Sequence, residues 1–230
     1  GRVDCGVRVS CLPRRDEMTA PLFNRDALLP GMILSRMTPH WISRAIVLRT
    51  QGLRVLLAGS GLSHDAMLIR TGDAWFAGDA LMGKLASLTP LEDWEADMRE
   101  RGVRVVVSRP LDATPRQMAA AAWFWQTEIN WLVWYDRKAI LALAWRWLAE
   151  RFGHKVGDED RLYCTESCQL AYREGACVDP WRKQDGTRKW NPTPGTTRKR
   201  IVGGGGWRTL AEVPDALTEA GRRYAINFSR

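Results

Sequence analysis

Residues 64–79 read HDAMLIRTGDAWFAGD, two apolar runs separated by a turn sequence. The first run, residues 64–69, is too short for a helix and is flanked by turn residues, which is typical of a buried strand. RTGD at residues 70–73 is a turn sequence, and residues 74–81 read as a returning strand. The stretch therefore predicts an antiparallel β-hairpin.

The register of this hairpin decides which polar side chains meet. If Arg70–Asp73 form a four-residue loop, Ile69 faces Ala74. Counting outward from that pair places His64 opposite Asp79. Opposed residues have Cβ atoms about 4.5–5.5 Å apart, so a carboxylate can reach an imidazole there. A slip of one residue would turn the two side chains to opposite faces of the sheet.

Helices and strands are interleaved around the hairpin. This pattern predicts a single α+β domain, with most of the tryptophans in its core. Strands are expected after the Pro-Gly turn in residues 30–36, at 53–59 and at 103–110. Helices are expected at 39–52, 89–102, 114–132 and 134–153 and after residue 164, and a loop at 191–206.

The ends of the domain and its surroundings follow from composition. We expect residues 1–28 to be a flexible leader and residues 29–230 to form the domain. The first seventeen residues lack the apolar core of a secretory signal. No uncharged apolar run approaches about eighteen residues, so no membrane span is expected. These features suit a cytoplasmic protein or one carried in a phage particle.

The formal net charge of +8 favours contact with an anionic molecule. Much of this charge lies between Arg182 and Arg200, a segment with seven basic residues, Arg188 and Lys189 among them, and the single acid Asp185. Two interpretations remain open. The segment is either a solvated loop or a clamp for an anionic polymer or substrate.

Five cysteines, an odd number, argue against a disulfide scaffold. Cys164 and Cys168 form a C-x3-C pair, but no histidine follows at zinc-finger spacing, so a zinc site is only weakly indicated. We therefore expect neither a metal nor an organic cofactor.

Cys164 precedes a run with helical periodicity, and the first turn of a helix stabilises the reactive thiolate form. Among three histidines, His64 is the best candidate for its base, because a polar group at the end of a buried strand needs a reason to be there. The alternative is that both residues are structural. Tyr163, Thr165 and Glu166 are candidates for the oxyanion site and the helix cap, and we prefer capping for the last two.

The order of these motifs resembles that of a known enzyme family. PGMILSR, SHDAMLI, AGDAL, VRVVVSRP and LYCTESCQLAY follow one another as in the circularly permuted papain-like hydrolases, the YiiX-type relatives of the NlpC cell-wall peptidases. The resemblance covers about residues 29–202. It departs from the family at Met32, where an aspartate is usual, at Asp65, where a small residue is common, and at Asp79, where a glutamate is usual.

The resemblance implies a small antiparallel sheet or half-barrel packed against helices, with Cys164 as nucleophile, His64 as base and Asp79 as the acid that orients the imidazole. The expected activity is hydrolysis of an amide or ester acyl bond through an acyl-enzyme. A peptidoglycan peptide and a lipid or peptide amide are both compatible substrates. An enzyme that hydrolyses the cell wall could also be carried in a phage particle, where it needs no export.

Substrate contacts are expected from Trp75, Arg188 and Lys189. The rival hypothesis is a non-catalytic module that binds nucleic acid or another polyanion through the Arg182–Arg200 segment. Under the hydrolase hypothesis we do not expect nucleic acid as a partner.

Overall fold

The structure, a computed structural model, describes residues 20–81, 84–131, 134–135, 161–162, 164–182, 192–203 and 210–228. Its centre is an antiparallel sheet in the order β4-β3-β2-β1-β5-β8, and β6 and β7 form a separate parallel pair. The strands are β1 Ile33–Met37, β2 His64–Thr71, β3 Ala74–Asp79, β4 Ser87–Pro90, β5 Arg104–Pro110, β6 Trp134–Tyr135, β7 Arg161–Leu162 and β8 Leu210–Glu212.

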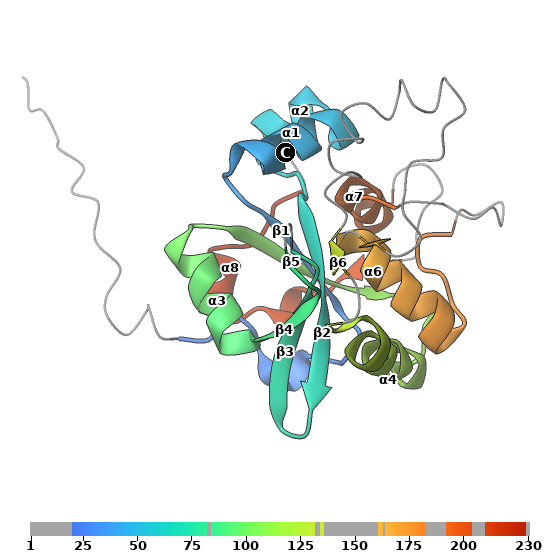
Figure 1. The fold of residues 1–230 in the computed structure, drawn as a ribbon. Coiled ribbons are helices and arrows are strands. Elements are labelled where there is room, and N and C mark those ends of the chain that lie inside the picture. Colours follow the sequence, from blue (N-terminus) through green and yellow to red (C-terminus); the bar gives the residue numbers. More distant parts are fainter. Residues whose placement is uncertain are drawn as a thin grey trace, which may run out of the picture.

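Helices lie on both sides of the central sheet. Figure 1 shows α3 on one side, α4, α6 and α7 on the other, and α1 with α2 beyond one end of the strands. The α-helices are α1 Trp41–Gln51, α2 Leu53–Leu57, α3 Leu91–Glu100, α4 Pro115–Phe124, α6 Cys164–Leu170, α7 Pro194–Val202 and α8 Glu219–Arg222. Short 3-10 or π turns span Arg25–Ala27, Trp125–Ile129, Ala171–Gly175 and Pro214–Ala216. The predicted α+β class is confirmed.

The central hairpin forms, but with a tighter turn than predicted. Thr71 pairs with Ala74, so the loop contains only Gly72 and Asp73, and Ile69 pairs with Phe76. A positive φ of 60° at Gly72 is what the first loop position of such a tight turn requires. The register is therefore displaced by two residues from the prediction. Because side chains alternate with a period of two, this displacement keeps His64 and Asp79 on the same face.

The two faces of β2 have different neighbours. His64 lies on the face that carries Asp79 and Trp94 of α3, as the hydrogen bonds among these residues show. Asp65 lies on the opposite face, where it contacts Thr165 of α6. The side chains of His64 and Asp65, although adjacent in the chain, thus lie on opposite faces of the sheet.

Two segments differ from the prediction. The short strand expected at residues 53–59 is helix α2, because a brief apolar run has no periodicity that distinguishes helix from strand. The loop expected at residues 191–206 contains helix α7. Its signals are explicit: Thr193 forms a capping box, Pro194 occupies the first turn, and Gly203 ends the helix with a φ of 74°.

The tryptophans are divided between core and surface. Trp125 is fully buried, whereas Trp123 and Trp131 are exposed. Trp134 lies in β6 and not in the helix expected at residues 134–153, whose residues 136–153 lie outside the described part of the chain.

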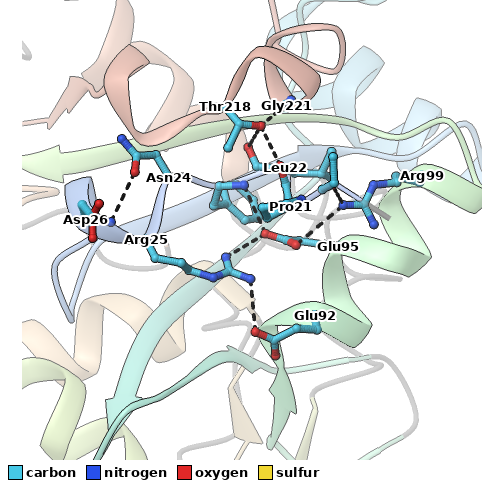
Figure 2. Close-up of polar contacts among 12 residues, drawn as sticks. Pro21, Leu22, Asn24, Arg25, Asp26, Glu92, Glu95, Arg99, Thr218 and Gly221 are labelled. Atoms are coloured by element: carbon cyan, nitrogen blue, oxygen red, sulfur yellow. Dashed lines mark hydrogen bonds and ion pairs between the residues drawn. The ribbon is translucent and has the colours of Figure 1, made fainter. Parts of the chain in front are cut away.

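The packed domain begins before residue 29. Leu22 and Phe23 are buried in the core, and the Thr218 backbone N–H donates to Leu22 O (2.9 Å). Glu95 of α3 accepts hydrogen bonds from Phe23 N (3.1 Å) and Arg25 Nη1 (2.7 Å). Figure 2 shows the contact between Arg25 and Glu95. Residues 20–28 of the predicted leader therefore belong to the domain, because apolar burial and a buried carboxylate hold them there.

Substitution of Gly31 by alanine is expected to destabilise the protein by about 3 kcal/mol or more. Gly31 has a φ of +88°, and an added Cβ would lie 2.4 Å from the backbone oxygen of Met118, which cannot move aside cheaply. Gly102→Ala is the matched control, since Gly102 also has a positive φ (+59°) but has open space around it. Chemical denaturation measures the free energy of unfolding of both variants. An equal loss of stability in the two variants would contradict the steric argument.

Candidate active site

A buried imidazole–carboxylate pair lies at one end of the hairpin. His64 begins β2 and Asp79 ends β3, and His64 Nε2 lies 2.5 Å from Asp79 Oδ1. Both side chains are buried. The contact predicted from the hairpin is therefore present, although the residues are diagonal neighbours and not directly opposed.

Two further residues hold the Asp79 carboxylate. Trp94 Nε1 donates to Asp79 Oδ2 (3.0 Å), and Arg36 Nη2 lies 3.7 Å from the same oxygen. Burial alone would raise the pKa of Asp79, but the charges of Arg36 and His64 and the hydrogen bonds from His64 and Trp94 leave it below its usual value. Asp79 is thus an anion held on three sides.

Sequence reasoning missed Arg36 and Trp94. Arg36 pairs with His64 in the β1–β2 register, and its guanidinium lies 5.3 Å from the Trp94 ring centroid. An arginine within an apolar strand was the available signal, because a buried cation requires a partner. Nothing in the local sequence identified Asp79 as that partner.

His64 is held in its charged form. Burial favours the neutral imidazole, but the charges of Asp79 and Cys164 outweigh it and, despite Arg36, raise the pKa of His64 to about 9. At neutral pH the ring is therefore an imidazolium. Because Nε2 is directed at Asp79, Nδ1 is the nitrogen left for exchange with another group.

Cys164 is the first residue of α6 and is buried. Its Sγ lies 4.0 Å from Thr165 Oγ1, and Ser167 Oγ donates to its carbonyl oxygen (2.7 Å). The sulfur is near enough to His64 to influence the pKa of the imidazole, but no hydrogen bond joins these two described side chains. The structure thus places the thiol at a helix start, as predicted, and couples it electrostatically to the imidazole.

Asp65 organises the opposite face of β2. Its carboxylate accepts hydrogen bonds from Ser35 Oγ (2.6 Å), Thr165 Oγ1 (2.6 Å) and Thr197 Oγ1 (2.7 Å). Trp181 Nε1 in turn donates to Thr197 Oγ1 (3.0 Å). Burial raises the pKa of Asp65, and these hydrogen bonds with the charge of His64 only partly offset it. One carboxylate therefore connects β1, β2, α6 and α7.

Two of the predicted cap residues lie in the first turn of α6. The Thr165 hydroxyl donates to Asp65 and so joins the helix start to the sheet. Glu166 lies in the first turn of α6, where an acid favours the helix dipole. Tyr163 lies outside the described residues.

A cavity of about 560 Å³ adjoins His64. It lies between α1 and the ends of β1 and β2, and its walls combine apolar and basic groups. Its described lining includes Pro39, Ile42, Ile46, Leu81, Arg36 and Arg101.

The predicted substrate contacts do not line this cavity in the described part of the chain. Trp75 is buried in the core, with the Arg70 guanidinium 5.4 Å from its ring centroid. Arg188 and Lys189 lie outside the described residues. Among the residues that are described, no three His, Cys, Asp or Glu side chains form a group that could hold a metal ion.

Stability is expected to fall as pH rises through the pKa of His64. Because the pKa of His64 is raised, the His64–Asp79 ion pair contributes fully to the free energy of unfolding below pH 6.5. This contribution is lost as the pH approaches about 9. The contribution is about 3 kcal/mol at most. Denaturant unfolding at pH 6 and at pH 9.5 should therefore differ more for the native protein than for His64→Gln; an identical pH dependence in both would contradict the charged pair.

Thr165→Val is expected to cost about 2 kcal/mol, because it removes a donor from a buried carboxylate with little change of shape. Thr127→Val is the control, since the exposed Thr127 hydroxyl donates only to the Trp123 carbonyl oxygen. Urea denaturation of the two variants compares them. If Thr165→Val lowers the free energy of unfolding no more than Thr127→Val does, the hydrogen bonds to Asp65 contribute little to stability.

No protein-family model and no curated protein matches the sequence. Among solved structures, the chain is similar to the crystal structure of metalloprotein yiiX from Escherichia coli O157:H7, DUF1105. The two share 20% identity and a TM-score of 0.47, over 82% of this chain and 90% of that chain.

Proposed function

We propose that the protein is a cysteine hydrolase that cleaves an amide or ester acyl bond, with Cys164 as nucleophile and His64 as its acid–base partner. One observation carries the proposal: a buried imidazole is bonded to a carboxylate and coupled electrostatically to a thiol at a helix start. Perturbed ionisation among a nucleophile, a base and an orienting acid is a common property of active sites.

The proposed reaction has two stages. The Cys164 thiolate attacks the carbonyl carbon, and the His64 imidazolium gives its proton to the departing amine or alcohol as the carbon–heteroatom bond breaks. Neutral His64 then takes a proton from water, whose oxygen attacks the thioester. Cleavage of the carbon–sulfur bond releases the carboxylic acid and restores the thiolate–imidazolium pair.

Asp79 acts as a positioning residue in this scheme. It holds Nε2 of the ring and leaves Nδ1 for proton exchange, and Arg36 and Trp94 hold Asp79 in turn. A shorter aspartate suffices because the two strands already bring the side chains together. The raised pKa of His64 supports its role as the proton donor to the leaving group at neutral pH.

The cavity beside His64 is the proposed entry for the acyl substrate. Ile42, Ile46 and Leu81 give it an apolar wall, while Arg36 and Arg101 lie at its polar side. A lipid amide or ester and a peptide amide, including one from a cell wall, both remain compatible with such a lining.

The rival hypothesis of a polyanion-binding module has less support. In the basic segment Arg200 is fully buried and Arg198 lies 5.5 Å from the Phe228 ring centroid, so part of its charge is used within the fold. Lys199 is exposed and remains accessible to an anion.

Labelling of thiols with iodoacetamide, followed by peptide mass spectrometry, tests the proposal. We expect Cys164 to react faster at pH 7 than the exposed Cys177, because the proposed pairing with His64 would hold Cys164 as the thiolate, which is the reactive form. His64→Ala should slow Cys164 labelling by about tenfold or more, and Asp79→Asn should slow it less. Hydrolysis of acyl nitrophenyl esters should disappear in Cys164→Ala.

Cys177→Ser is the control and should leave Cys164 labelling unchanged. Labelling of Cys164 at the same rate with and without His64 would refute the proposed pair. Salt-sensitive binding of heparin or DNA that survives Cys164→Ala, in a protein without thiol reactivity, would favour the rival hypothesis.

A further inference from the structure

We propose that α1 and α2 form a docking surface for an anionic lipid bilayer, on which the protein lies without crossing the membrane. The surface consists of Trp41, Leu48, Leu53 and Leu57 with Arg44, Arg49 and Arg54. The inference is independent of the chemistry at Cys164.

Large apolar side chains are concentrated on this helix pair. Trp41 is 71% exposed and Leu48 47%, while Leu53 and Leu57 of α2 are 57% and 76% exposed. Single exposed apolar residues are normal on a protein surface. Four on two consecutive short helices form a group that favours an apolar partner.

The exposed apolar residues of α1 form one stripe. At about 100° per residue, Trp41, Ala45 and Leu48 lie on one side of the helix, opposite the buried Val47 and the half-buried Thr50. Arg44 and Arg49, both exposed, flank the stripe on its two sides. Long arginine side chains beside an apolar stripe can place their charges among lipid headgroups while their stems stay near the acyl chains.

The charge of this surface is of one sign. Residues 38–64 contain Arg44, Arg49 and Arg54 but no aspartate or glutamate. In the described part of the chain, none of these three arginines forms an ion pair. Positive charge next to exposed tryptophan and leucine is the combination that binds anionic lipid surfaces.

The helix pair projects from the rest of the fold. Figure 1 shows α1 and α2 beyond the end of the sheet, so a flat surface could contact them. Val47 packs against Gly61. Gln51 Nε2 donates to Leu62 O (2.5 Å), and Gln51 Oε1 accepts from the Leu62 backbone N–H (2.9 Å). This attachment uses the inner side of α1 and leaves the stripe outside.

Two other occupants fit less well. A second copy of the chain, placed face to face, would bring like-charged arginines together without any acid to pair them. A nucleic acid would use the arginines but would leave the leucines without an apolar contact. No described helix is long and apolar enough to cross a membrane, so the predicted contact is with the bilayer surface.

Sedimentation with phospholipid vesicles tests the proposal. We expect the full chain to sediment with phosphatidylcholine vesicles that contain phosphatidylglycerol, less with phosphatidylcholine alone, and less at about 0.5 M NaCl. Trp41→Ser/Leu57→Ser should lower the partition coefficient by about tenfold or more. Arg44→Gln/Arg49→Gln/Arg54→Gln should remove the preference for phosphatidylglycerol.

Leu111→Ser/Trp123→Ser is the matched control, because Leu111 is 51% and Trp123 63% exposed on other elements. This control should bind vesicles as the native protein does. Far-ultraviolet circular dichroism checks the fold of each variant, and if the apolar variant fails to fold, the arginine variant decides the question.

Absence of vesicle binding, or equal losses in the control and test variants, would overturn the proposal. Self-association that requires Trp41 and Leu57 would identify a second copy as the occupant instead. Binding of DNA but not of vesicles through the three arginines would assign the surface to nucleic acid.

Discussion

The two-residue period of strand β2 is the constraint on which the arrangement depends. It sends His64 and Asp65, adjacent in the chain, to opposite faces of one sheet. A buried charge must be paired or hydrogen-bonded on its own face. On one face the imidazole contacts Asp79, which Arg36 and Trp94 hold in turn, and on the other face three hydroxyl groups donate to the Asp65 carboxylate.

The Asp65 network links the proposed chemistry to the fold. Thr165 follows Cys164 directly, and its hydrogen bond to Asp65 holds the start of α6 against the strand that begins with His64. The Cys164 thiol is near enough to His64 to influence the pKa of the imidazole. Under the proposed function, the hydrogen bond from Thr165 to Asp65 would hold the nucleophile in place, as proximity in catalysis requires.

The cavity and the proposed docking surface share helix α1. Ile42 and Ile46 line the cavity, whereas Trp41 and Leu48 face outward. A lipid-bound α1 would hold the cavity close to the bilayer. Under the proposed hydrolase function, this position would favour an acyl substrate taken from the membrane. The proposed lipid-docking surface and the proposed Cys164 chemistry are nevertheless independent of each other.

The sequence by itself determined the hairpin, the α+β class and the contact between His64 and Asp79. Local alternation and turn residues specify a strand pair, and the contact survived a register displaced by two residues because the period is two. The sequence also contains the capping signals of α7. Only the tertiary structure decided the partners Arg36 and Trp94, the bond from Thr165 to Asp65 and the packing of residues 20–28. These contacts join residues far apart in the chain, and such pairing depends on how elements pack and not on any local pattern.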